Sequence, residues 1–363
     1  MGIKLTDVDE NFKVESPLGI ENLVYHDIKT TPFQIYGADQ ETFTREGLWR
    51  IPEGVAKECG LTWGANCTAG FRVRFQTDSE YVAVTVVFVD TIGNRLGGLT
   101  RMACDLYVDH YNGSIFAKRM VPDVDVTDRY EGIAHLETRK KRYFTLYLPT
   151  YTMVKAVYIG LEEGAFIGPG REYLDVKPVV YYGSSITQGG TCHRPGNTYQ
   201  SVISRRNNVD HKNLGFSGMG MAQIPIMEYI SGLDMSVFVY DGLNTKKKGI
   251  EFLKSIHERG FKIVREKNPE LPIIILSWPR SECFDTEKHL KFLNERRVVE
   301  MQTFINAVNS GDENVYFIDG TQYFNVPDGD ICTTDGSHPT DYGFLRMADI
   351  IGNEIDRILR RKL

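Results

Sequence analysis

Short runs of alternating hydrophobic and polar residues dominate the chain from about residue 30 to residue 160. The run at 71–75 alternates strictly, and the run at 81–89 is rich in β-branched and aromatic residues. Comparable runs lie at 105–108, 143–148 and 154–159. Turn signals such as Gly97-Gly98 and Asn112-Gly113 separate them, and no long amphipathic helix interrupts the pattern. This arrangement is typical of an all-β sandwich or jelly roll.

The pattern changes after the segment 164–170, which ends in Gly-Pro-Gly and marks a domain boundary. Beyond it the apolar runs are solid rather than alternating, at 178–182, 236–240, 272–276 and 315–318. Solid runs suit strands that are buried on both faces of a parallel sheet. Helical stretches lie between them, most clearly at 249–267 and 286–308. The sequence therefore predicts a β domain over 1–165, followed by a doubly wound α/β domain over 172–363.

Composition and charge narrow the possible partners. The 363 residues are 42% hydrophobic and 25% charged, with a net charge of −6, which gives no electrostatic reason to expect nucleic acid. No stretch approaches the roughly 18 consecutive apolar residues that a membrane span needs. The N-terminal residues lack the apolar core of a secretory signal. We therefore expect a cytoplasmic protein if the chain is full-length, and a periplasmic or secreted one if a signal was removed. The six cysteines show no CxxC pair or other metal-type spacing, and an oligomer is possible.

Polar segments follow the predicted strands of the second domain, where ligand sites of open α/β sheets lie. Ser185 follows the first strand, Gly218 lies after the second, and Asn244 comes just after the third. Asp335 and His338 precede the C-terminal helix. Because carboxyl ends of parallel strands share one edge of the sheet, we expect these residues to converge.

Together these residues could carry out acyl transfer. A serine hydroxyl is a poor nucleophile until a base takes its proton, and His338 is the natural base for Ser185. Asp335, three residues earlier, can fix the tautomer of that histidine. The oxyanion needs donors already aimed at it, for which the candidates are the backbone N–H groups of Ser185 and Gly218 and the side chain of Asn244. This chemistry requires no metal and no cofactor.

Each motif also has a structural interpretation. A Gly-Ser-Ser turn after a strand is often a helix N-cap, Asp-x-x-His is often a solvated turn, and Asn244 could cap a helix. The loop around Gly218 could be a tight turn that needs small residues. Rival signatures are missing, because the chain has no phosphate-binding GxxxxGK[ST] and no GxGxxG. Ser185 also lacks the following glycine of an α/β-hydrolase elbow. The order of four motifs at successive strand ends favours catalysis.

The four segments resemble the conserved blocks of the SGNH (GDSL) hydrolase superfamily over roughly residues 176–360. The resemblance implies a flavodoxin-like parallel sheet, with Ser185 as nucleophile, Gly218 and Asn244 as oxyanion donors, and Asp335 and His338 as the remaining pair. Two positions depart from the family pattern. The Asp that usually precedes the nucleophile is Ser184, and the Asp that commonly follows the Asn is Thr245. Neither position transfers a proton in the family.

The first domain carries a second resemblance. The segment 103–107 is similar to the GxDLY signature of acylhydrolases that have an N-terminal β domain, although Ala103 replaces its glycine. Asp105 and Tyr107 are interpreted either as paired strand residues at an interdomain seam, which we favour, or as substrate contacts. The two-domain layout also resembles that of carbohydrate deacetylases with a jelly roll before an SGNH domain.

Two further residues are candidates for substrate binding. His193 is predicted to lie in a loop near the pocket rim, and Trp278 could stack on a sugar face or belong to the core. The other histidines show no ligand spacing.

Three functions remain open from the sequence. The first is a serine esterase that removes a small acyl group, such as acetyl, from a carbohydrate. The second keeps the site but acts on a lipid or a thioester, which would require a wide apolar surface around the pocket. The third is a carbohydrate-binding protein with a degenerate hydrolase domain, supported only by Ser184, Thr245 and Ala103.

Overall fold

The computed structural model describes residues 18–43, 47–90, 101–123, 126, 128–243, 248–279 and 287–360. The chain divides into two compact units. The first comprises Met1–Arg50, Asn66–Tyr173 and Arg194–Gly196, and the second comprises Ile51–Ala65, Leu174–His193 and Asn197–Leu363. Compared with the predicted domains, two segments are exchanged, Ile51–Ala65 and Arg194–Gly196, and Glu172 and Tyr173 fall in the first unit.

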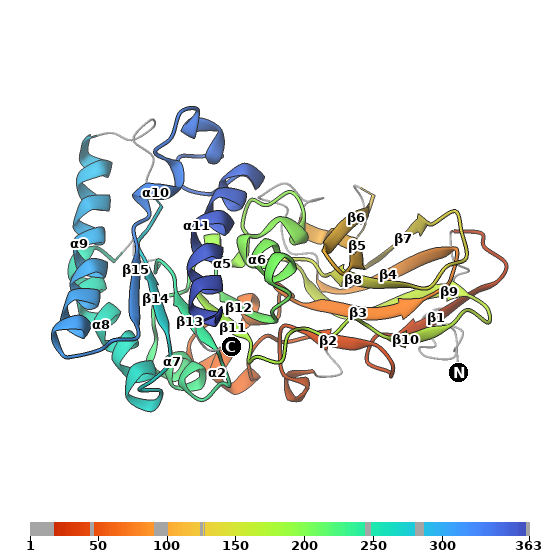
Figure 1. Ribbon diagram of the computed structural model, residues 1–363, viewed down its shortest axis with the longest axis horizontal. Coiled ribbons are helices and arrows are strands. Elements are labelled where there is room, and N and C mark those ends of the chain that lie inside the picture. Colours follow the sequence, from red (N-terminus) through yellow and green to blue (C-terminus); the bar gives the residue numbers. More distant parts are fainter. Residues whose placement is uncertain are drawn as a thin grey trace. The chain divides into compact units, whose positions relative to one another are not determined.

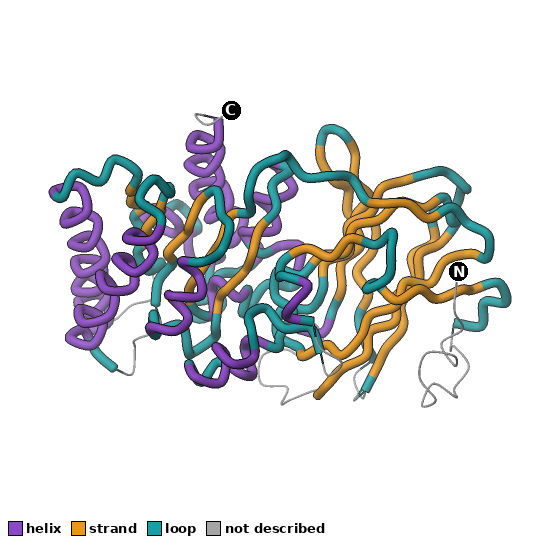
Figure 2. Tube along the Cα trace, turned by 90° about the horizontal axis from the view of Figure 1, so that it is seen from below, coloured by secondary structure: helices purple, strands orange, loops and turns teal. Residues whose placement is uncertain are grey.

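The first unit is built from two antiparallel sheets (Figure 2). One has the order β1-β9-β4-β7, formed by Leu23–Asp27, Met153–Glu162, Tyr81–Asp90 and Arg129–His135. The other has the order β10-β3-β8-β5-β6, formed by Ile167–Pro169, Arg72–Thr77, Arg142–Tyr147, Cys104–His110 and Gly113–Met120, with β2 (Gln34–Tyr36) beside β3. A 3-10 helix, η1, spans Gln40–Thr42.

Alternation along the strands explains how the two sheets share a core. Val82, Val84 and Val86 point to one face of β4 and belong to the same hydrophobic cluster as Leu106 of β5 and Phe144 of β8. Residues of both sheets belong to this one cluster, so the two sheets cover each other's apolar faces, as in a β-sandwich. The predicted all-β region therefore corresponds to an antiparallel two-sheet unit.

The second unit contains a five-stranded sheet in which every neighbouring pair is parallel. Its order is β12-β11-β13-β14-β15, formed by His211–Gly215, Val179–Gly183, Val237–Tyr240, Ile273–Leu276 and Val315–Ile318. The longer helices are α6 (Tyr199–Asn207), α7 (Ile224–Ser231), α8 (Ile250–Lys267), α9 (Glu287–Asn309) and α11 (Asp341–Arg360). The shorter ones are α2 (Glu53–Glu58), α3 (Thr62–Ala65), α5 (Ser185–Gln188), α10 (Thr321–Phe324) and η3 (Gly329–Cys332). A further 3-10 helix, η2 (Pro195–Asn197), has its first two residues in the first unit.

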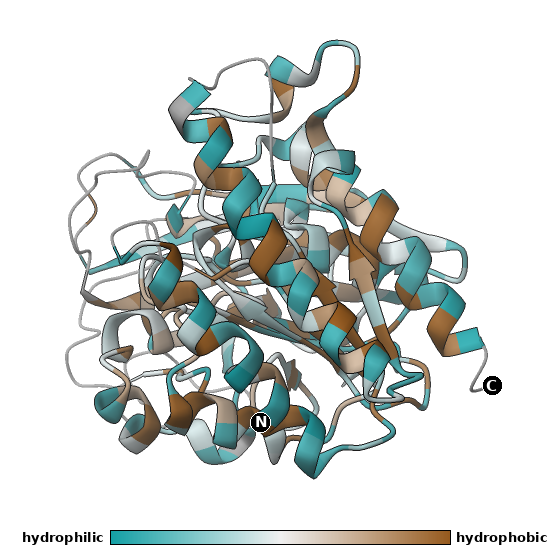
Figure 3. Ribbon diagram, turned by 90° about the vertical axis from the view of Figure 1, so that its left-hand side faces the viewer, coloured by the Kyte–Doolittle hydropathy of each residue, from teal (hydrophilic) through white to brown (hydrophobic). Residues whose placement is uncertain are grey.

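Helices cover both faces of this sheet, with α8 and α9 on one side and α6 and α11 on the other (Figure 1). Successive strand residues point to opposite faces. Tyr181 and Val239 therefore join the cluster formed with α6 and α11, whereas the ring of Tyr240 stacks on His257 of α8 at 4.8 Å between ring centroids. Figure 3 shows the hydrophobic strands behind helices that carry both hydrophobic and hydrophilic residues. The predicted doubly wound α/β fold is confirmed.

The strands of the parallel sheet end in register. Gly183 pairs with Gly215, Tyr182 pairs with Tyr240, and Leu276 pairs with Ile318. The segments that follow these strands therefore emerge along one edge of the sheet. Among the described residues, no helix has the length and apolar character needed to cross a membrane.

Candidate active site

Ser185 is the first residue of the four-residue helix α5, directly after β11. The turn is tight, because a Cβ atom on Gly183 would lie 2.2 Å from Oγ1 of Thr187. Ser184 occupies the N-cap position but its side chain makes no capping hydrogen bond. Ser185 itself is only 6% exposed, and its Oγ lies 2.9 Å from Nε2 of His338.

His338 is held by a turn that begins at Asp335. One carboxylate oxygen, Oδ2 of Asp335, lies 2.7 Å from Nδ1 of His338. The other, Oδ1, accepts the backbone N–H groups of Ser337 and His338 at 3.0 and 2.8 Å. The turn closes through the Thr334 N–H, which donates to the His338 carbonyl at 2.9 Å. Gly336 has a φ of 81°, a conformation that other residues rarely adopt, so the turn requires glycine there.

These contacts determine that Asp335 is a carboxylate and which ring nitrogen of His338 carries the proton. Burial would raise the pKa of Asp335, but the N–H groups of His338 and Ser337 and the imidazole hold that pKa below its ordinary value. A carboxylate can only accept hydrogen bonds, so Nδ1 of His338 carries the proton and Nε2 presents its lone pair to the Ser185 hydroxyl. The arrangement can therefore take a proton from Ser185 and return it to a leaving group.

The loop after β12 brings Gly218 to the same edge of the sheet. Gly218 is exposed and has a φ of 73°. Its N–H makes no hydrogen bond with any described part of the chain, whereas the N–H of Ser217 donates to Oε1 of Gln188 at 2.8 Å. The other predicted oxyanion donor, Asn244, and the departure at Thr245 lie outside the described residues.

The two further candidate substrate contacts have different surroundings. The side chain of His193 is 64% exposed, its backbone N–H donates to Oδ1 of Asp341 at 2.8 Å, and its ring nitrogen lies 3.6 Å from that oxygen. Trp278 is half-buried, and the guanidinium of Arg296 lies 4.7 Å from its ring centroid. The backbone N–H of Trp278 donates to Oε2 of Glu300 at 3.1 Å. His193 is thus accessible to a ligand, while Trp278 is tied to neighbouring charged groups.

Asp105 and Tyr107 lie on β5 and are buried, at 0% and 4% exposed. Oδ2 of Asp105 accepts the N–H of Gly196 at 3.0 Å. A Cβ atom on Gly196 would lie 2.7 Å from the Tyr107 ring and 2.9 Å from the Asp105 carboxylate. These two residues therefore pack against the segment Arg194–Gly196, which belongs to the same unit as β5.

A buried carboxylate beneath the nucleophile turn escaped the sequence analysis. Asp241, 2% exposed, lies just after β13, and its Oδ2 accepts the hydroxyl groups of Thr187 and Tyr199, each at 2.8 Å. Its Oδ1 accepts the N–H of Gly242 at 2.7 Å. Burial raises the pKa of Asp241 despite these bonds. The sequence places Asp241 directly after an apolar strand run, which could have marked it as a candidate. Nothing in the spacing of residues along the chain identified Thr187 and Tyr199 as its partners.

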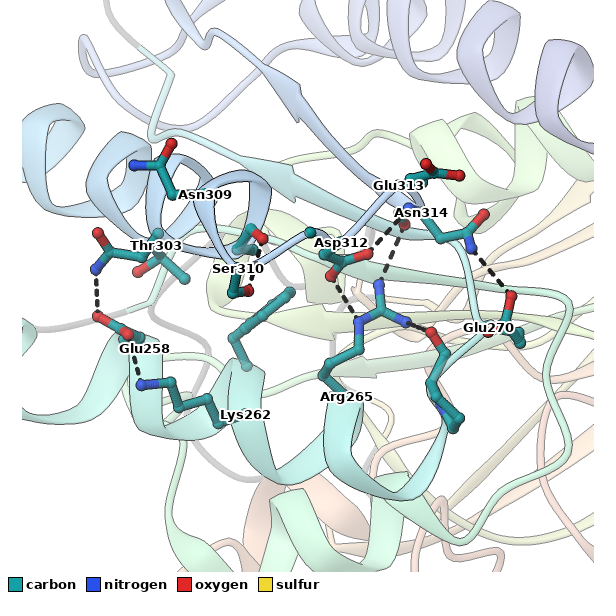
Figure 4. A pocket seen from close by; sticks show the side chains of 15 residues that line it. Glu258, Lys262, Arg265, Glu270, Thr303, Asn309, Ser310, Asp312, Glu313 and Asn314 are labelled. Carbon is teal, nitrogen blue, oxygen red and sulfur yellow. Dashed lines mark hydrogen bonds and ion pairs between the residues drawn. The ribbon is translucent and has the colours of Figure 1, made fainter.

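A cavity lies elsewhere in the second unit. It has a volume of about 750 Å³ and is lined by α8, the end of α9 and residues 309–314 (Figure 4). Several of its charged groups are paired with one another, as Arg265 is with Asp312 and Lys262 is with Glu258, each at 2.7 Å. Within the described residues no group of three or more His, Cys, Asp or Glu side chains is placed to hold a metal ion.

Both parts of the chain match known protein families. Residues 176–356 match the GDSL-like lipase/acylhydrolase family, and residues 23–167 match the N-terminus of SGNH-hydrolase-type esterases. The chain therefore belongs to the GDSL-like lipase/acylhydrolase family, in the group that carries the GxDLY N-terminal domain, and it is an ester hydrolase. The predicted family and enzyme class are confirmed. No curated protein matches the chain.

Solved structures share the fold over most of the chain. A protein assigned as a GDSL-like lipase from Bacteroides ovatus superimposes with a TM-score of 0.82 and 24% identity, covering 93% of this chain and 98% of that one. A salicylyl-acyltransferase from a tetracycline biosynthetic pathway gives 0.72 and 20%, with the same coverage of 93% and 98%. An acetyl xylan esterase from the rumen bacterium Butyrivibrio proteoclasticus gives 0.56 and 13%, again covering 93% and 98%.

Proposed function

We propose that the protein is a serine esterase that removes small acyl groups, such as acetyl, from a carbohydrate, with Ser185, His338 and Asp335 as its catalytic residues. One observation carries the proposal. The contacts Ser185 Oγ to His338 Nε2 and His338 Nδ1 to Asp335 Oδ2, at 2.9 and 2.7 Å, form a continuous path of hydrogen bonds, along which only the Ser185 proton moves, to His338.

The reaction follows from this path. Oγ of Ser185 attacks the acyl carbonyl while its proton moves to Nε2 of His338, and the new imidazolium is stabilised by Asp335. The tetrahedral oxyanion accepts hydrogen bonds from the N–H groups of Ser185 and Gly218 and from the side chain of Asn244. His338 then protonates the leaving alcohol. A water molecule, deprotonated by His338, hydrolyses the acyl-enzyme and releases the carboxylic acid.

Burial supports the choice of a small acyl group. Ser185 is 6% exposed, whereas the side chains of His338 and Asp335 are 30% and 53% exposed. A nucleophile so nearly covered favours a short acyl substituent, and the alcohol that His338 protonates leaves on the exposed side. The similarity in fold to an acetyl xylan esterase supports a carbohydrate as that alcohol.

The test is a substrate panel of p-nitrophenyl esters with increasing acyl length, together with acetylated sugars and xylan. We expect turnover of the shortest esters by the wild type and loss of it in Ser185→Ala. Ser184→Ala, the same change one residue earlier, is the matched control and should retain most activity. Undiminished hydrolysis by Ser185→Ala would overturn the assignment.

The same panel separates the alternatives. Preference for long acyl chains or acyl thioesters would favour a lipase or thioesterase. Glycan binding without turnover of any ester would favour a binding protein with a degenerate site. Either result would overturn the carbohydrate acyl esterase.

A further inference from the structure

The loop that carries Gly218 is held by a pattern of hydrogen bonds that leaves one donor available. The two N–H groups that follow Gly218 in the chain both donate to the carbonyl of Phe216, at 3.0 and 2.9 Å. The N–H of Ser217, which precedes it, donates to Oε1 of Gln188 at 2.8 Å. Within the described part of the protein, the N–H of Gly218 makes no bond of its own. The peptides on both sides of this donor are therefore fixed.

Gln188 brings the nucleophile helix and this loop together. It is the last residue of α5, three residues after Ser185, and is fully buried. The end of β12 packs directly against it, because a Cβ atom on Gly215 would lie 2.2 Å from the backbone nitrogen of Gln188. The side chain thus reaches from the turn that carries the nucleophile to the loop that carries the candidate oxyanion donor.

We propose that Gln188 is a positioning residue that orients the N–H of Gly218 toward the oxyanion formed at Ser185. The inference rests on the proposed function, because it assigns an oxyanion role to Gly218. A side-chain amide oxygen accepts the Ser217 N–H without adding charge beside the developing oxyanion. The same four-residue helix therefore sets both the attacking atom and the direction of the donor.

Loss of this bond should affect the transition state more than the bound substrate. Without the amide oxygen the Ser217 N–H loses its partner, and the Phe216–Ser217 peptide is held only through its carbonyl, so the adjoining peptide that carries the Gly218 N–H is less firmly oriented. An oxyanion donor binds strongly only when charge has developed on the carbonyl oxygen. Removing such a donor lowers kcat by about 100-fold or more, so misdirecting one should lower kcat by roughly 10- to 100-fold with little change in KM.

The experiment compares Gln188→Met with Gln200→Met on a short-chain p-nitrophenyl ester. Gln200 is equally buried and also contacts α5, donating to the carbonyl of Thr187 at 2.7 Å, but it does not bond the loop 216–220. We expect Gln188→Met to lose kcat, to keep KM and the pH profile, and to bind a trifluoromethyl ketone inhibitor more weakly. Gln200→Met should keep kcat within about threefold. Equal kcat losses in the two variants, or an unchanged kcat in Gln188→Met, would overturn the inference.

A second variant covers the case in which Gln188→Met does not fold. Ser217→Pro removes the N–H from the loop side and leaves Gln188 intact, at a half-buried position. It should cause a similar loss of kcat, and the double variant should lose little more than either single one. If the kcat losses of the two single variants add up in the double variant, the two residues do not act through the bond between them. A wild type that lacks Ser185-dependent esterase activity would refute the proposed function instead, which keeps the two failures distinguishable.

Discussion

His257 lies on α8, packed against β13, and its imidazole should make the second unit sensitive to acid. The side chain is fully buried, its Nδ1 lies 2.8 Å from Oγ1 of Thr303, and its ring stacks on Tyr240. Burial, together with the nearby positive charge of Arg296, lowers the pKa of His257 to about 3. The folded protein therefore keeps this imidazole neutral at pH values where the unfolded chain would protonate it.

The size of the effect follows from proton linkage. The pKa is lowered on folding, from an ordinary value of about 6.5, so the unfolded state binds more protons between these two pKa values. The stabilisation is fully present above about pH 6.5 and is lost as the pH falls toward about 3. Each pH unit below 6.5 costs about 1.4 kcal/mol, so a fall from pH 8 to about pH 4.5 should cost about 3 kcal/mol from this residue.

The assay is urea unfolding at pH 8 and at about pH 4.5, comparing the wild type with His257→Asn. Asparagine can still bond Thr303 but does not titrate. A Trp49→Phe background leaves Trp63 and Trp278, both in the second unit, as reporters of its unfolding. Between the two pH values, the wild type should lose about 3 kcal/mol more than His257→Asn.

Thr303→Val is the control for this prediction, because it removes the hydrogen-bond partner and keeps the imidazole. It should lower the stability at both pH values and retain the pH dependence of the wild type. An equal loss of stability on acidification in the wild type and in His257→Asn would refute the reasoning.

Three further predictions concern other parts of the chain. Asp335→Asn should lower kcat by roughly 10²- to 10⁴-fold in steady-state assays, because His338 loses the anion that selects its tautomer and stabilises its charge; a kcat within tenfold of the wild type would contradict this role. Burial raises the pKa of Glu300 to about 7, so its contribution to stability is greatest below about pH 4.5 and is lost as the pH rises through 7. Glu300→Gln should therefore remove the loss of stability that urea unfolding shows as the pH rises through 7. The same loss in Glu300→Gln as in the wild type would contradict this role of Glu300. Gly196→Ala should destabilise the first unit by about 1–3 kcal/mol in thermal unfolding, because its Cβ would meet the ring of Tyr107; an unchanged midpoint would show that the ring can move aside.

The pattern of hydrophobic residues along the strands predicted the sheet type of each unit, because burial on one face and burial on two faces produce different patterns. In the first unit β3 alternates, with Val73 and Phe75 in the hydrophobic core and polar residues between them, whereas β13 and β14 are buried on both faces and read as solid runs. The strand-end rule then placed Ser185 beside His338, although 153 residues separate them in the chain. Their contact follows from the common edge at which the parallel strands end.

The remaining contacts depend on how far and in which direction a side chain extends, which the spacing of residues along the sequence does not show. Asp241 bonds Thr187 across 54 positions and Gln188 bonds Ser217 across 29, and both bonds require particular rotamers at the ends of neighbouring strands. Asp105 could be recognised as an inward-facing strand residue, but the backbone that covers it, at Gly196, lies 91 positions away. No change in composition marks that segment as part of the first unit.

The helix α5 explains why a weak sequence signal can hold a well-defined site. Four residues are too few to form a stable helix in isolation, since nucleation alone is unfavourable. Each residue after Ser185 has a separate anchor: Ile186 packs into the hydrophobic core, Thr187 bonds a buried carboxylate, and Gln188 bonds the loop that carries Gly218. The orientation of the nucleophile is therefore determined by these three contacts together with the few backbone hydrogen bonds of the helix itself. A substitution at any of these anchors should change the reaction geometry without touching the substrate.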